Sequence, residues 1–280
     1  MKKIILTTDF SENAWNAIFN ALKLYEGVTC HFYLLHAYTP TNLNMLGAKS
    51  QQRLGVIYDS LSKYSEQELE GMFSYFQINH KNPKHTFTTV SKAGILEEVV
   101  EKLAIEEDID LIIMGTQGAT GAKEIFLGSN AVRVIKTIKN IPIITMPSGF
   151  NFLKLNTIHF GTNFSTPYKK SELEPIIELS KLWKSTIEII HVSVENSLND
   201  SQKANKEILK ERLLGLSYQF KTIPFEISIS KSLDIYLENK TSSILSLIRH
   251  QHTFWEKVLG EAVVKKIAFH ADLPVLFLPQ

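Results

Sequence analysis

The stretch Leu111–Ser129, LIIMGTQGATGAKEIFLGS, decides the fold of this chain. Its first four residues are apolar, and so short an apolar run is typical of a strand that is buried on both faces of a sheet. Four glycines follow the run, and from Ala131 onward the apolar residues return at helical spacing. The stretch therefore predicts a strand, a glycine-rich loop and a helix in direct succession.

This succession of elements is suited to binding an anion. Because glycine has no Cβ, a loop rich in glycine can turn sharply and bring its N–H groups close to a ligand. The N–H groups and the dipole at a helix start favour a negative charge such as phosphate.

The alternative is an ordinary turn between a strand and a helix. Neither G-x-x-x-x-G-K-[ST] nor G-x-G-x-x-G fits; the spacing is Gly115-x-x-Gly118, nine residues, then Gly128-Ser129.

Composition and charge indicate a globular protein of about two domains. The chain has 280 residues, 44% hydrophobic and 21% charged, which is enough for two cores. A formal net charge of +1 gives no electrostatic case for binding nucleic acid or an anionic membrane. Cys30 is the only cysteine, so an intrachain disulfide and a cysteine-based zinc site are excluded, and we expect a buried thiol. With no membrane-spanning apolar run and too short an apolar start for a signal peptide, we expect a cytoplasmic protein.

Strands and helices alternate along the first half of the chain. That alternation predicts a mostly parallel sheet with helices on both of its faces. Ser11 is a suitable N-cap for the first helix. Strands are expected at residues 2–8, 29–38, 85–90, 111–114 and 141–146, and helices over residues 14–22, 51–76, 95–104 and 131–138.

Three of these segments end where a ligand would bind. In open parallel sheets, ligands lie beyond the carboxyl ends of the strands, where the strand order reverses. The first strand ends at Thr7, Thr8 and Asp9, and the second ends at His36 and Ala37. The glycine loop follows the fourth strand. We therefore expect one cleft to gather all three segments.

The chain repeats itself. The second copy lacks part of the middle, where a linking helix is expected over residues 198–216. The repeat predicts one domain over residues 1–148 and a second over 152–280, with the boundary in the turn-forming segment 147–151. The matching segments are 7–11 with 161–165, 34–37 with 189–192, and 126–128 with 258–260.

The second copy lacks the residues on which a phosphate loop depends. At a shift of 132 residues, a carboxylate occupies the place where a phosphate would lie, and like charges there oppose binding. A metal site at His250 and His252 is the less favoured alternative to a polar loop, because no further ligand lies at a recognisable spacing. The replaced positions are Gly115 by Leu247, Gly118 by His250 and Ser129 by Glu261, while Asn163 replaces Asp9 at the other shift.

Together these motifs resemble the universal stress protein family, as two family domains in tandem over nearly the whole chain. The resemblance is carried by the glycine spacing with Ser129, the opening ILTTDFSE, Leu34–Ala37 and the segment 110–115. It implies two tandem five-stranded α/β sheets of Rossmann-like, adenine nucleotide alpha hydrolase-like fold, with fifth strands that pair domains. The strands at 141–146 and 273–278 are then expected to pair within the chain.

The same resemblance implies that the first copy binds ATP, with Mg²⁺ coordinated mostly by phosphates and water. The loop and Ser129 would hold the triphosphate, and Asp9 would accept hydrogen bonds from the adenosine. A threonine at position 7, where the family often has proline, is a departure. The expected nucleotide-binding residues are Thr7, Thr8, Asp9, Ala37, Met114, Gly115, Thr116, Gly118, Gly128, Ser129 and Asn130.

The sequence leaves several functions open. The first is a nucleotide-binding stress regulator that acts on an unidentified protein partner. A slow ATPase is disfavoured because the sequence places no general base, nucleophile or arginine finger near the loop. A scaffold that uses no nucleotide and a relative that binds a different adenine ligand are also compatible with these motifs. We expect neither a catalytic residue nor a protein-ligated metal, and we expect the chain to be an internal pseudo-dimer that can dimerise further.

Overall fold

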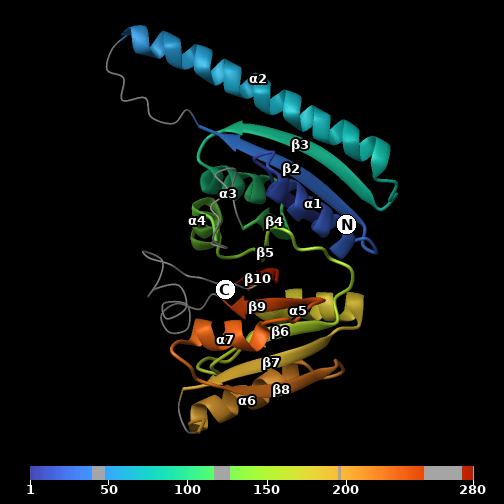
Figure 1. Ribbon diagram of the computed structural model, residues 1–280, viewed down its shortest axis with the longest axis vertical. Coiled ribbons are helices and arrows are strands. Elements are labelled where there is room, and N and C mark those ends of the chain that lie inside the picture. The colour runs from blue at the N-terminus through green and yellow to red at the C-terminus, as the bar shows by residue number, and fades with distance from the viewer. Residues whose placement is uncertain (40–47, 117–126, 195–196, 249–272, 280) are drawn as a thin grey trace.

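The computed structural model describes residues 1–39, 48–116, 127–194, 197–248 and 273–279, and its strands form a single ten-stranded sheet (Figure 1). The first half of the chain supplies one side of this sheet. Its elements are β1 (Lys2–Thr7), α1 (Glu12–Leu24), β2 (Cys30–Tyr38), α2 (Ala48–Asn79), β3 (His85–Ala93), α3 (Leu96–Glu106), β4 (Leu111–Gly115), α4 (Ser129–Thr137) and β5 (Ile143–Met146).

The second half supplies the other side of the sheet and repeats the same alternation as far as β9. Its elements are β6 (Thr157–Gly161), α5 (Lys170–Trp183), β7 (Thr186–Ser193), α6 (Asp200–Arg212), β8 (Tyr218–Pro224), α7 (Ile229–Leu237), β9 (Ser243–Ile248) and β10 (Val275–Leu278). The linking helix α6 is shorter than expected at both ends, whereas α2 is longer than expected.

The two halves join through their last strands. The strand order is β3-β2-β1-β4-β5-β10-β9-β6-β7-β8, and β5 pairs with β10 in antiparallel fashion, with Thr145 opposite Val275. Every other pairing in the sheet is parallel. The expected α/β fold and the expected pairing of the two fifth strands are therefore confirmed.

The sheet has a hydrophobic layer on each face. One layer includes residues of α1, α2, α5 and α6, and the other includes residues of α3, α4 and α7. Because both faces are covered, Leu111–Met114 of β4 are all buried, as the apolar run predicted. Cys30 is fully buried in β2, also as expected.

The segment between the halves is held against α1. Asn20 is 2% exposed, and its Nδ2 donates to the carbonyl of Phe150 at 2.8 Å. The N–H of Phe152 donates to Asn20 Oδ1 at 2.6 Å. Trp183 Nε1 donates to the carbonyl of Leu24 at 3.0 Å. These bonds fix the connection and join the second half to α1.

The sheet register corrects one alignment. Ile112 pairs with Ile143 in the first half, whereas Leu245 pairs with Val275, the counterpart of Ile143, in the second. Strand β9 is therefore offset from β4 by 133 residues rather than 132, and the counterpart of Gly115 is Ile248, not Leu247. The shift of 132 was wrong for β9 because it holds only for the segments that follow the loop. Either residue is large and apolar.

No helix among the described residues combines the length and the apolar composition that crossing a bilayer requires.

Candidate functional site

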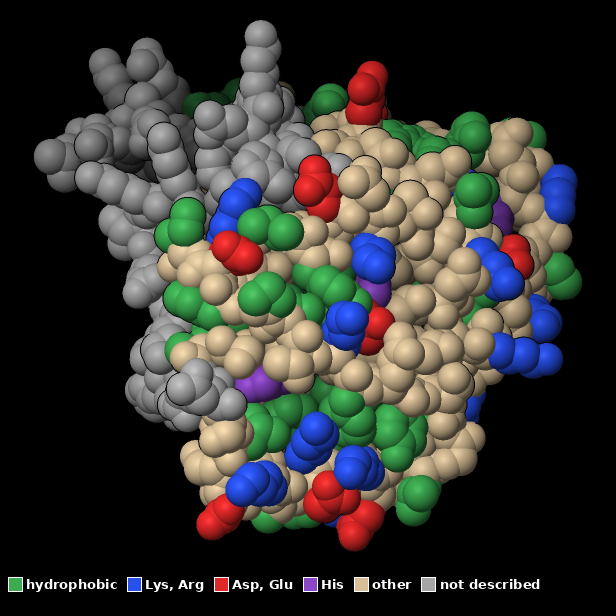
Figure 2. All heavy atoms as spheres, turned by 60° about the horizontal axis from the view of Figure 1, so that its bottom comes forward, with side chains coloured by type: hydrophobic (Ala, Val, Ile, Leu, Met, Phe, Trp, Pro, Cys, Tyr) green, Lys and Arg blue, Asp and Glu red, His purple; other side chains and the backbone are tan. Residues whose placement is uncertain are grey.

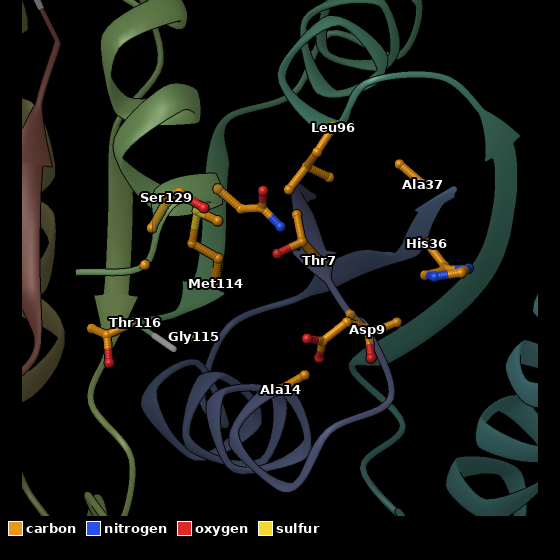
Figure 3. Close-up of a pocket in the computed structure, with 14 residues that line it drawn as sticks. Thr7, Asp9, Ala14, His36, Ala37, Leu96, Met114, Gly115, Thr116 and Ser129 are labelled. Atoms are coloured by element: carbon orange, nitrogen blue, oxygen red, sulfur yellow. The ribbon is translucent and has the colours of Figure 1, made fainter. Parts of the chain in front are cut away.

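The strand order reverses between β1 and β4 in the first half, and a cavity of about 360 Å³ lies at their carboxyl ends. That volume is within the range of small-molecule sites, and the position is the one that parallel sheets use for ligands. Figure 3 shows Thr7 and Asp9 near its middle, Met114 and Ser129 on the side of β4 and α4, and Leu96 from α3.

The structure brings together all but one of the residues expected to bind a nucleotide. The exception is Gly118, which lies outside the described residues. The lining also contains His36, which was expected at the cleft but not as a nucleotide-binding residue, and three residues that the sequence reasoning did not select, namely Ala14, Leu96 and Ala131. The expected residues that line the cavity are Thr7, Thr8, Asp9, Ala37, Met114, Gly115, Thr116, Gly128, Ser129 and Asn130.

Leu96 shows what the sequence reasoning missed. The third strand ends at the same edge of the sheet as the first two, because β3 pairs in parallel with β2. Gly94 then has φ +146°, a conformation open to glycine, and its N–H donates to the carbonyl of Tyr38 at 3.0 Å. This turn starts α3 beside the cavity. The glycine after the third strand was the available signal.

The start of α4 faces the cavity without a side-chain cap. Gly128 occupies the N-cap position, and its N–H donates to the carbonyl of Thr116 at 2.5 Å. A glycine cannot cap the following N–H groups with a side chain, so the first turn of α4 presents its backbone donors at the cavity wall. The glycine-rich sequence predicted a helix start of this kind, and such a helix start favours an anion.

The side-chain oxygen of Asn130 is bonded to an arginine of the same helix. Arg133 Nη2 donates to Asn130 Oδ1 at 2.5 Å, and Arg133 Nε lies 3.1 Å from Glu97 Oε1. These contacts link the first turn of α4 to the first turn of α3. The Arg133 contact uses the acceptor oxygen of Asn130, so its backbone N–H and its Nδ2 group are both able to donate to an anion.

Asp9 is held in a tight turn at the end of β1. Its Oδ1 accepts from the N–H of Ser11 at 3.1 Å and from the Ser11 hydroxyl at 2.5 Å. The same hydroxyl accepts from the N–H of Ala14 at 3.3 Å, which confirms Ser11 as the N-cap of α1. Phe10 adopts φ 65° in this turn, and the N–H of Phe10 donates to Thr8 Oγ1 at 2.9 Å. The turn places the Asp9 carboxylate on the cavity wall.

Gly115 is required by packing as well as by any ligand. A Cβ at this position would collide with the side-chain amide of Asn13 on α1, closer than real contacts allow. The first turn of α1 therefore lies directly on the end of β4. The glycine lets α1 begin at the cavity.

His36, at the end of β2, is hydrogen-bonded to a neighbouring helix. Its Nδ1 lies 2.8 Å from the hydroxyl of Ser65 on α2, and the Ser91 hydroxyl donates to the same oxygen at 2.7 Å. Burial lowers the pKa of His36, and the nearby Asp9 carboxylate opposes that effect. The imidazole ring packs on Phe10 with 4.5 Å between ring centroids.

His250 and His252, which were considered as a metal site in the second copy, lie outside the described residues, as do Gly260 and Glu261. The residues that the structure does describe contain no group of three or more His, Cys, Asp and Glu side chains placed to hold a metal ion.

Comparisons with known proteins agree with this geometry. Residues 1–141 match the universal stress protein family. A universal stress protein of Methanocaldococcus jannaschii is 29% identical over 158 residues, which cover 52% of this chain and 94% of that protein.

Two solved structures resemble nearly the whole chain. A universal stress protein from Archaeoglobus fulgidus has a TM-score of 0.67 at 15% identity, covering 99% of this chain and 96% of that one. A putative universal stress protein from Pseudomonas aeruginosa has a TM-score of 0.54 at 9% identity, covering 100% and 93%. At these identities the likeness concerns the fold.

Proposed function

Since the chain belongs to the universal stress protein family, we propose that it is an ATP-binding regulator of the stress response, which holds one adenine nucleotide in the cavity of its first half and acts in the cytoplasm. The single observation that carries this proposal is the make-up of the cavity wall. A small apolar surface, one carboxylate and an uncapped helix start lie around the same 360 Å³ space. These features match the base, the ribose and the phosphates of a nucleotide.

The base and the ribose are assigned to the part of the cavity that lies between Asp9 and Ala37 in Figure 3. Ala37 and Leu96 on this side, with Met114 across the cavity, give a small and apolar wall, which is what a flat heterocycle needs. The Asp9 carboxylate accepts hydrogen bonds from hydroxyls, as a ribose presents them. In this assignment Thr7 completes the floor between the two parts.

The phosphates are assigned to the start of α4. The backbone N–H groups of Ser129 and Asn130 and the Ser129 hydroxyl would donate to phosphate oxygens, helped by the helix dipole. Asp9 is the only carboxylate among the described lining residues. This donor set suits Mg²⁺ held mainly by phosphates and water rather than by the protein.

Binding is favoured over catalysis by what lines the cavity. Hydrolysis of a phosphoanhydride needs an oriented water and a charge-stabilising cation. Among the described lining residues there is no lysine or arginine, and the ring of His36 is bonded to Ser65. The protein is therefore proposed to hold its nucleotide and to pass that state to a protein partner.

The second half is proposed to be a domain of its own over residues 152–280, next to a nucleotide-binding domain over 1–148. Ile248 stands where the first half has Gly115, so the second half is assigned no nucleotide. The pairing of β5 with β10 makes the chain an internal pseudo-dimer. We further propose that two chains associate into a homodimer. Measuring the oligomeric state in solution would test this part of the proposal.

The decisive experiment is to denature the purified protein and to identify released nucleotides by mass spectrometry, followed by an ATP titration. The proposal expects about one ATP per chain. ADP with steady turnover would favour the slow ATPase, and another adenine compound would replace ATP as the ligand. No bound nucleotide and no binding on titration would overturn the proposal in favour of a nucleotide-free scaffold.

A matched pair of variants locates the site. Gly128→Val adds a branched side chain at the helix start and is expected to abolish ATP binding in a folded protein. Gly71→Val adds the same side chain at a position on α2 with nothing within 4 Å, and binding should be retained. Equal affinity in both variants would contradict the assignment of the phosphates to α4.

A further inference from the structure

The second half contains a cavity that has no counterpart in the proposed nucleotide site. It has a volume of about 150 Å³ and lies between β7, β8 and α6. Its apolar wall comes from Phe164, Ile189, Leu198 and Phe220. An apolar cavity of about 150 Å³ is large enough for a benzene ring. The space is therefore suited to a small body and is too small for a nucleotide.

The corresponding position in the first half is covered by a helix. In the first half, Phe10 and His36 are covered by α2, whose Tyr64 packs edge-on against Phe10 and whose Ser65 bonds to His36. The corresponding residues of the second half are Phe164 and His191, with ring centroids 5.4 Å apart. There His191 Nδ1 lies 3.1 Å from the carbonyl of Thr162.

Helix α6 places a cation in this position. Lys206 Nζ lies 4.6 Å from the ring centroid of Phe220 and 5.8 Å from that of Phe164, and all three residues line the cavity. Among the residues that the structure describes, Lys206 has no carboxylate within ion-pair distance, unlike its neighbours Lys203, which pairs with Asp200, and Lys210, which pairs with Glu207.

The other polar groups around the cavity are compatible with an anion. A second lysine, Lys221, lines it together with His191, Ser193, Ser197 and Thr222, and none of the described lining residues is acidic. A carbonyl only accepts hydrogen bonds, so His191 Nδ1 carries the proton in its contact with Thr162. Figure 2 shows this end of the molecule, where lysine side chains lie over and beside exposed hydrophobic side chains.

We propose that this cavity binds a small organic carboxylate with an apolar or aromatic body. Lys206 pairs with the carboxylate, and the rings of Phe164 and Phe220 enclose the apolar body. The ammonium group is already partly desolvated against the two rings, so a carboxylate meets it with less competition from water than on an open surface. This site is separate from the proposed nucleotide site and does not depend on it.

Benzoate is the probe, and benzamide is its neutral counterpart of nearly the same shape. Titrations followed by ligand-observed NMR are expected to show benzoate binding to the full-length protein at least tenfold more tightly than benzamide. Lys206→Met, which keeps the apolar stem but removes the charge, should weaken benzoate binding at least tenfold. Lys203→Met, one turn earlier on α6, should leave it unchanged. Gly128→Val should also leave it unchanged, because that substitution alters only the first half.

Several outcomes would overturn the proposal. Equal affinity for benzoate and benzamide would show that the cavity recognises only the apolar ring and not the carboxylate. Benzoate affinity that survives Lys206→Met, or that falls with Gly128→Val, would place the ligand elsewhere. Inorganic phosphate that competes as well as benzoate would show that the apolar body has no role, and an absence of benzoate binding would remove the site altogether.

Discussion

Asp9 Oδ1 accepts from the N–H of Ser11 at 3.1 Å, and Asn163 Oδ1 makes the same bond to the N–H of Ser165 at 3.0 Å in the second half. The following residues, Phe10 and Phe164, have φ values of 65° and 55°. The turn therefore needs a side-chain oxygen and not a negative charge. The charge of Asp9 has to be explained by something else in the first half.

The Asp9→Asn substitution distinguishes the role of Asp9 in the turn from its proposed role in ATP binding. Since Asn163 supports the same turn, the melting temperature should stay unchanged. ATP affinity should fall about tenfold or more, because a hydrogen bond to a charged acceptor contributes roughly 1.5–3 kcal/mol. Calorimetric titration measures the affinity. An unchanged affinity would mean that Asp9 serves the turn alone.

Asn20→Ala should loosen the connection between the halves. It leaves the buried N–H of Phe152 and the partly buried carbonyl of Phe150 without their partner, at a cost of about 1–3 kcal/mol for the N–H and less for the carbonyl. Urea unfolding measures the effect. The control is Asn79→Ala, because Asn79 bonds to the carbonyl of Tyr75 on its own helix, in an exposed position. Equal losses in the two variants would argue against an anchored connection.

Gly115→Ala should strain the contact between α1 and β4. The added methyl group collides with Asn13, and overpacking of this kind costs roughly 1–3 kcal/mol. Thermal unfolding measures the loss, and adding Asn13→Ala in the same chain should restore most of it. Gly71→Ala, at an open helical position, should instead stabilise the protein by up to about 1 kcal/mol. If adding Asn13→Ala to Gly115→Ala restores no stability, the packing explanation is wrong.

The raised pKa of Tyr33 predicts that the free energy of unfolding falls at high pH. Its hydroxyl donates to Glu107 Oε2 at 2.7 Å, and burial, reinforced by this carboxylate, raises the pKa of Tyr33 to about 12. An unfolded tyrosine loses its proton near pH ~10, so between about pH 10 and 12 the unfolded state is increasingly favoured. Urea unfolding at pH 9 and 11 should show a smaller drop in Tyr33→Phe than in the parent protein. Equal drops would exclude Tyr33 as a source.

Several histidines predict a loss of stability on the acid side. Burial lowers the pKa of each of them, so on acidification the unfolded chain takes up protons near pH ~6.5, before the same groups do so in the folded protein. The free energy of unfolding should therefore fall between pH 7.5 and 5.5 by urea titration. It should fall less in His159→Gln, which removes a ring that is 2% exposed. A flat profile would contradict the lowered pKa values of His31, His36, His80, His85 and His159.

Much of the fold could be predicted from sequence because the strands of this sheet are buried on both faces. The apolar runs therefore mark β1, β2 and β4 directly. The third strand was predicted to end at Val90 but continues to Ala93, because Ser91–Ala93 pair with His36–Tyr38 through the backbone, which leaves no apolar trace. The fifth strand begins at Ile143 rather than 141, after Pro142, which has no N–H to donate.

The candidate site was predictable where it depends on strand ends and glycines. Asp9, Ala37 and Ser129 come from segments far apart in sequence, yet parallel topology places all three at one edge. Side-chain contacts across helices left no such signal. The links from Ser65 to His36 and from Asn13 to Gly115 depend on where α2 and α1 lie, and the small cavity beside Lys206 depends on where α6 lies.

The pairing of β5 with β10 also governs how the protein can vary. A domain that pairs through its last strand can exchange partners with any similar domain in the cell. Here that strand edge is occupied by the same chain, so every molecule contains one half of each kind in equal number. Neither β5 nor β10 therefore has an open edge with which a strand of another chain could pair. The second half can accept substitutions such as Ile248 for glycine without supplying a defective subunit to others.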